Sequence, residues 1–139
     1  DFPEPTEKLS TPVPFRVSQS DVRPGDEITI EAVRGNRPRF EENGAYVVRG
    51  TYKLASAEDA QLAFSEQTTE PGLCSTSSGR DKLFVKRGTG KFELATALPF
   101  EGYAHVAFYV QDRGAGGVVF GRTPTFTQNL ARKVATVTR

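Results

Sequence analysis

The stretch Leu83–Val110, LFVKRGTGKFELATALPFEGYAHVAFYV, carries the most regular patterning in the chain. Apolar and polar residues alternate through it, with Gly-containing breaks at 86–90 (KRGTG) and 99–102 (PFEG). Two-residue alternation is typical of half-buried β-strands, and Gly-containing breaks are typical of turns. The stretch therefore predicts three consecutive strands, with a hairpin turn at 86–90 and a second turn at Pro99–Gly102.

The last of these strands is apolar on most of both faces. Alternation places Ala104, Val106, Phe108 and Val110 on one face, and Tyr103, His105, Ala107 and Tyr109 on the other. A strand with two largely apolar faces is typical of a central position in a sheet, covered at least in part on both sides.

Upstream, Pro24–Gly25 predicts a turn, and the alternation over Glu27–Ala32 predicts a strand. The run Ala45–Ala55 predicts another strand, in which Gly50 marks a bulge or the close approach of a second backbone. Ser56–Asp59 reads as a turn that leads to a short strand containing Leu62 and Phe64. A helix over Ala55–Phe64 is the alternative, because its Ala and Glu residues favour helix.

Loops are predicted at Arg34–Asn43 and Thr68–Asp81, and a further turn at Arg113–Gly117. Val118–Phe120 predicts a strand. Residues 128–139 fit a helix and a strand equally well.

Length and composition limit the classes of protein to which the chain can belong. A chain of 139 residues is one ordinary domain, and its 13 Gly and nine Pro predict many turns. The formal charge of +1 gives no overall field to attract nucleic acid. No apolar run approaches the roughly 18 residues that cross a bilayer, so no membrane-spanning helix is expected. Cys74 is the single cysteine, which excludes an internal disulfide.

Residues 1–14 contain four prolines and predict an extended leader or linker, with the folded domain at 15–139. The sequence contains no Met, which suggests a processed or trimmed chain. We therefore expect an extracytoplasmic protein, either secreted, periplasmic or at the cell surface.

Two short motifs resemble β-sandwich families. The Pro24–Gly25 turn and the strand after it resemble the start of the second strand in immunoglobulin-like and fibronectin-type-III-like domains of exported bacterial proteins. Leu98–Pro99 followed by Tyr103 is similar to the start of the penultimate fibronectin-type-III-like strand. The resemblance implies that Tyr103 hydrogen-bonds back to the backbone as a corner.

With the regular turn signals, these observations predict an all-β fold. We expect a single antiparallel β-sandwich, immunoglobulin-like, of about seven to nine strands.

His105 is the only imidazole in the sequence. This excludes metal sites that need two histidines, and a His105 general base would need a serine or Cys74 in hydrogen-bond reach. No G-x-S-x-G motif is present. We expect a partly buried strand residue, with no catalytic, cofactor-binding or metal-binding residues.

Two groups of residues are candidates for ligand binding. Tyr103, His105 and Tyr109 share a strand face, where aromatic rings can stack on a sugar. Arg34, Arg37 and Arg39 cluster in one loop and suit anionic groups, although Glu41 and Glu42 partly neutralise them.

The sequence favours a non-catalytic exported module that binds a protein or glycan, or that spaces other domains. The alternatives are a structural subunit completed by β-strand addition in a larger assembly, and a small enzyme that uses His105.

Overall fold

The computed structural model describes residues 9–68 and 80–123, and every regular element among them is a strand. The predicted all-β fold is therefore confirmed. This part of the chain holds no helix long and apolar enough to cross a membrane. The strands are β1 (Thr11–Pro12), β2 (Gln19–Val22), β3 (Glu27–Gly35), β4 (Gly44–Thr68), β5 (Lys82–Leu98), β6 (Gly102–Val110) and β7 (Arg113–Arg122).

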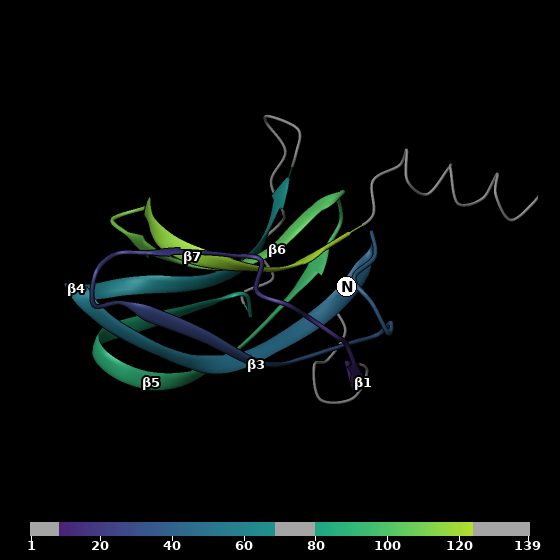
Figure 1. Cartoon of the computed structure of the whole chain (residues 1–139), viewed down its shortest axis with the longest axis horizontal. Coiled ribbons are helices and arrows are strands. Elements are labelled where there is room, and N and C mark those ends of the chain that lie inside the picture. Colours follow the sequence, from purple (N-terminus) through teal and green to yellow (C-terminus); the bar gives the residue numbers. More distant parts are fainter. Residues whose placement is uncertain (1–8, 69–79, 124–139) are drawn as a thin grey trace, which may run out of the picture.

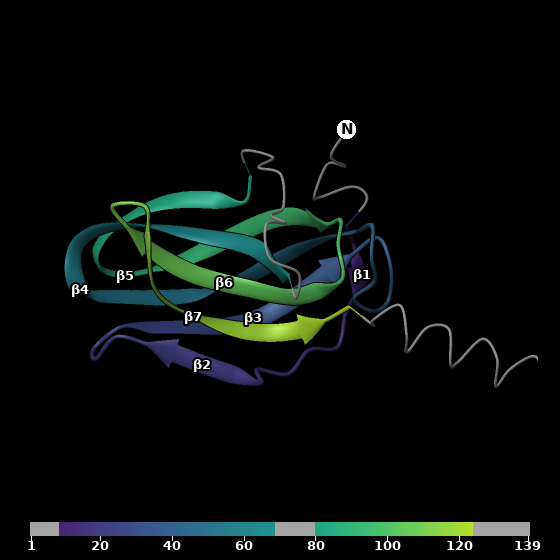
Figure 2. The same ribbon diagram turned by 90° about the horizontal axis from the view of Figure 1, so that it is seen from above.

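The strands form one antiparallel sheet that curls around the core. Its order is β1-β3-β4-β6-β7-β2, and β5 pairs with β4. The first half of β4 pairs with β3 and β5, and its second half pairs with β5 and β6. In Figure 1, β6 and β7 lie above β3 and β5, and Figure 2 shows the same arrangement from above. The long strand β4 thus belongs to both halves of the curled sheet.

The bend in β4 and β5 is where the sequence predictions differ most from the structure. The register shifts between Leu54 and Asp59, but both strands continue past it. The predicted turn at Ser56–Asp59, the alternative helix over Ala55–Phe64 and the predicted hairpin turn at 86–90 are therefore wrong. Gly88 has a φ of 132°, which lets β5 bend with β4 instead of reversing. Leu83–Val110 accordingly holds two strands, joined at the predicted turn Pro99–Gly102.

Asp26 fastens this bend to the turn before β3. The predicted Pro24–Gly25 turn is confirmed, since the Asp26 amide donates to the Arg23 carbonyl at 3.0 Å. The Asp26 carboxylate accepts hydrogen bonds from the amides of Ala55 (2.7 Å) and Ser56 (2.9 Å) and from the Ser56 hydroxyl (2.6 Å). Burial raises the pKa of Asp26, but these bonds outweigh it and leave the pKa below its ordinary value.

The turn between β6 and β7 lies upstream of the position where the sequence predicted it. Gln111 and Asp112 both have positive φ, as a two-residue hairpin loop requires, and Val110 pairs with Arg113. The predicted turn at Arg113–Gly117 is therefore wrong, because those glycines lie within β7. Gln-Asp is not among the dipeptides that usually signal such a turn. The neighbouring glycines are a stronger turn signal, so the turn was predicted at their position.

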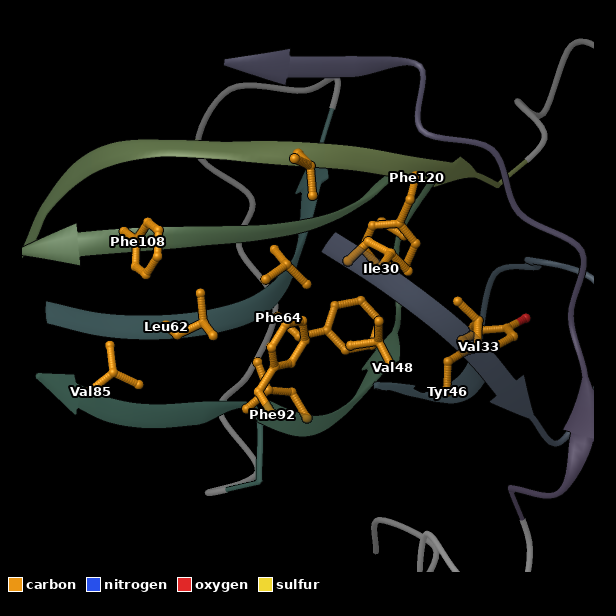
Figure 3. Packing of buried hydrophobic residues seen from close by; sticks show 14 of the residues in the cluster. Ile30, Val33, Tyr46, Val48, Leu62, Phe64, Val85, Phe92, Phe108 and Phe120 are labelled. Carbon is orange, nitrogen blue, oxygen red and sulfur yellow. The ribbon is translucent and has the colours of Figure 1, made fainter. Parts of the chain in front are cut away.

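The core fills the inside of the curl, and Figure 3 shows side chains from β3, β4, β5, β6 and β7 meeting there. The predicted alternation in β6 is confirmed, because Ala104, Val106 and Phe108 are buried. Gly50 allows the close approach of a second backbone, as the sequence suggested. A side chain there would collide with the Thr29 carbonyl and the Phe92 ring.

The segment before β3 connects the two edges of the sheet. The Val13 amide donates to Val33 of β3 (3.0 Å), and the Ser18 amide donates to Val119 of β7 (3.0 Å). Leu9 and Val13 are buried, so the described part of the expected leader belongs to the fold. Residues 1–8 and 128–139, on which other predictions were made, lie outside the described residues, and so does most of the predicted loop Thr68–Asp81.

Within the described residues the Tyr103 hydroxyl makes no hydrogen bond to the backbone, but the Tyr46 hydroxyl does. The Tyr46 hydroxyl donates to the Arg39 carbonyl (2.6 Å) and accepts from the Glu41 amide (2.8 Å). These bonds hold the loop between β3 and β4, where the predicted loop Arg34–Asn43 lies. Tyr103 instead packs near Arg122, whose guanidinium carbon is 5.8 Å from the ring centroid.

Candidate ligand-binding site

The outer face of β6 carries the aromatic candidates. We call the sheet surface turned away from the core the outer face. Because Val106 and Phe108 point into the core, alternation turns Tyr103, His105 and Tyr109 outward, and all three are partly exposed. β6 lies between β4 and β7, so neighbouring side chains flank these residues on both sides.

A hollow of about 230 Å³ lies on this face and brings together residues from β2, β4, β6 and β7. It includes His105 and Tyr109 but not Tyr103. We call it the trough, and its lining is Gln19, Asp21, Gln67, His105, Ala107, Tyr109, Gly114, Gly116, Gly117 and Val119.

Small residues make the floor of the trough. Gly117 pairs with Ala107, and a Cβ added at Gly117 would lie 2.6 Å from the Ala107 Cβ. Gly116 has a φ of 107° and lies against the backbone of Asp21. Gly116 and Gly117 therefore allow close strand packing, and the missing side chains of the glycines leave the hollow open.

The polar lining of the trough is mostly uncharged. Gln19 and Gln67 offer amide donors and acceptors, and Asp21 adds one carboxylate. Burial lowers the pKa of His105 below its ordinary value of 6.5, so the ring is neutral at pH 7. A neutral imidazole offers one donor and one acceptor.

His105 has no catalytic partner in the part of the chain that the structure describes. Its cross-strand neighbours are Ser65 on β4 and Val119 on β7. Within residues 9–68 and 80–123 the imidazole makes no hydrogen bond or ion pair, with Ser65 or any other group. Cys74 lies outside the described residues. The described residues also contain no group of three His, Cys, Asp or Glu side chains that could hold a metal ion.

The arginine candidates lie at a separate place and already have internal partners. Arg37 and Arg39 both pair with Glu41, at 3.3 Å and 3.2 Å. Arg34 donates to the Ser10 carbonyl at 3.3 Å. Their role in ligand binding stays a prediction, and an anionic ligand would have to compete with Glu41 for two of the three guanidinium groups.

A wider hollow of about 530 Å³ lies over β3, β4 and β5. Its charged lining is balanced, with Glu31 and Glu93 against Arg49 and Lys91. The Arg49 and Glu93 side chains form an ion pair at 3.3 Å. Balanced, exposed charge of this kind is ordinary for a protein surface and indicates no particular ligand.

Sequence reasoning missed most of the trough. Gln19, Asp21 and Gln67 come from β2 and β4, and no local signal links them to His105. Only the sheet pairing, in which β7 joins β6 to β2, brings them together. Searches against protein-family models, curated proteins and solved structures found no match.

Proposed function

We propose that this protein is a non-catalytic binding module that holds a glycan in the trough. The observation that carries the proposal is the combination of a partly exposed tyrosine and a floor of glycine and alanine with an amide-rich rim. Tyr109 presents an aromatic ring to the apolar face of a sugar. Gln19, Gln67 and the neutral His105 suit hydroxyl groups.

The size of the trough limits what it can hold. At about 230 Å³ it is smaller than the roughly 300–1,000 Å³ of drug-sized ligand pockets. A single sugar ring suits this space better than a large cofactor, because a shallow hollow buries only part of a bulky ligand.

We also propose that the two halves of the curled sheet form an immunoglobulin-like sandwich. We propose further that the protein is an exported bacterial protein that lies outside the cytoplasm. The two halves of the sheet enclose one core, and the segment before β3 pairs with both. A compact all-β scaffold that presents a sheet face to solvent suits such a module.

Binding to a glycan array, followed by calorimetry, tests the proposal. Tyr109→Ala should weaken binding of an array ligand about tenfold or more, because it removes the stacking surface. Tyr103→Ala is the matched control, on the same strand and face but outside the trough. It should leave the affinity nearly unchanged. A blank array, or full affinity in Tyr109→Ala, would overturn the proposal.

A second candidate is a structural subunit completed by β-strand addition. Among the described strands β5 pairs with β4 alone, and Phe84 near its start is 82% exposed. An open strand edge beside an exposed aromatic can accept a strand from another chain. Light scattering distinguishes the two candidates, since an assembly subunit should form a stable oligomer.

A further inference from the structure

Phe84 is the most exposed large apolar residue among the described ones, at 82%. It pairs with Gln61 of β4, and Gln61 pairs on its other edge with Tyr109 of β6. Directly opposed residues point to the same face of a sheet. Phe84, Gln61 and Tyr109 therefore form one row across three strands of the outer face, and the row ends at the trough.

Sheet geometry sets the spacing of the two rings. Adjacent strands lie about 4.8 Å apart, so residues two strands apart are separated by roughly 10 Å. An amide side chain lies between the two rings. A linear glycan that crosses the strands would thus meet an aromatic ring, an amide and a second aromatic ring in turn.

The charge around Phe84 favours an acidic ligand. Lys82 and Lys86 flank Phe84 on the same face. Lys86 lies opposite Asp59, which offsets its charge, but Lys82 lies opposite Ala63. Lys82 forms no ion pair within residues 9–68 and 80–123. One ammonium group beside an exposed ring is complementary to a sugar that carries a carboxylate.

We propose that Phe84, Gln61 and Lys82 form a second subsite that extends the trough. It takes a linear oligosaccharide running across β6, β4 and β5, with a uronic acid at the Phe84 end. This inference rests on the proposed glycan-binding function and names its ligand class. Stacking on Phe84 and the charge of Lys82 then contribute affinity only to chains long enough to reach beyond the trough.

The test uses an array of linear glycans from two to six sugar units, in neutral and uronic-acid-containing forms. We expect the wild-type protein to prefer long acidic chains. Phe84→Ala should weaken binding of the six-unit acidic chains about tenfold and leave the two-unit chains unchanged. Lys82→Gln should abolish the preference for acidic chains and the salt dependence of their binding.

Val17→Ala and Lys91→Gln are the controls, because Val17 is another exposed apolar residue, Lys91 is another exposed lysine, and both lie outside the row. Equal binding of long acidic chains by Phe84→Ala and the wild type would overturn the second subsite. If Tyr109→Ala still lost binding in that case, the trough itself would stand. Absence of wild-type binding to every chain would overturn the proposed function and this inference together.

Discussion

Tyr46 shows how one residue can fix a loop that the sequence alone leaves open. It is fully buried, and its hydroxyl bridges the Arg39 carbonyl and the Glu41 amide. Burial raises the pKa of Tyr46 above its usual value, even though the bond from the Glu41 amide lowers it. Its ring packs against Phe40, with the centroids 5.1 Å apart. The loop between β3 and β4 is therefore tied to the core by one side chain.

Tyr46→Phe removes this bridge and keeps the ring. The Arg39 carbonyl and the Glu41 amide lose their side-chain partner, so we expect unfolding to require about 1–3 kcal/mol less free energy. Urea unfolding measures the loss. Tyr103→Phe is the control, because that tyrosine lies on the outer face and should tolerate the change. Equal stability of Tyr46→Phe and the wild type would show that water replaces the bridge.

At the scale of the elements, glycines facing aromatic rings allow the sheet to curl. Phe92 lies over Gly50, and Tyr52 lies over Gly90. In each pair the glycine leaves space that the ring of the neighbouring strand fills. The halves of β4 and β5 on the two sides of the bend can then approach the same core.

Gly50→Ala tests this packing. The added methyl would collide with the Thr29 carbonyl and lie 2.8 Å from the Phe92 ring. We expect a loss of about 2 kcal/mol or more in unfolding free energy, because the backbone cannot easily move. Gly114→Ala is the matched control, since its nearest contact is Tyr109 at 4.0 Å. It should change stability by less than about 0.5 kcal/mol. Similar losses in both variants would contradict the packing argument.

Alternation predicted most of the strands, and the errors lie where backbone geometry overrides local signals. Ile30, Val106 and Phe108 point inward as their spacing predicts. The glycines at 88–90 and 114–117 signal turns in the sequence, because glycine favours them. In the structure Gly88 admits a bend, and Gly90, Gly116 and Gly117 admit close packing against residues distant in the chain. For the same reason the trough could be predicted only at His105 and Tyr109.

The pH dependence of stability is a property of the whole molecule, because every shifted group contributes. Glu66 is 5% exposed and accepts a hydrogen bond from the Phe100 amide at 2.7 Å. Burial raises its pKa from 4.5 to about 7, with a further contribution from Glu42. The folded protein therefore holds this proton more tightly than the unfolded chain, and stability falls as the pH rises from about 4.5 to 7.

His105 and Asp26 act in the opposite sense. Burial lowers the pKa of His105, so its contribution to stability is lost as the pH falls below 6.5. The hydrogen bonds to Asp26 hold its pKa below 3.8 against the effect of burial, so that contribution is lost only in stronger acid. Between pH 5 and 7 the effects of Glu66 and His105 therefore partly cancel in the wild-type protein.

Glu66→Gln separates these contributions, because glutamine keeps an acceptor for the Phe100 amide and cannot ionise. A pKa shift from 4.5 to about 7 corresponds to about 3 kcal/mol of unfolding free energy. As the pH rises from 5 to 8, the variant should therefore gain about that much stability relative to the wild type. Urea midpoints across this range measure the difference, with Glu58→Gln as the exposed control. If the difference in unfolding free energy between Glu66→Gln and wild type stayed constant with pH, Glu66 would be ionised throughout this range. Other interactions of the carboxylate would then offset the effect of burial on its pKa.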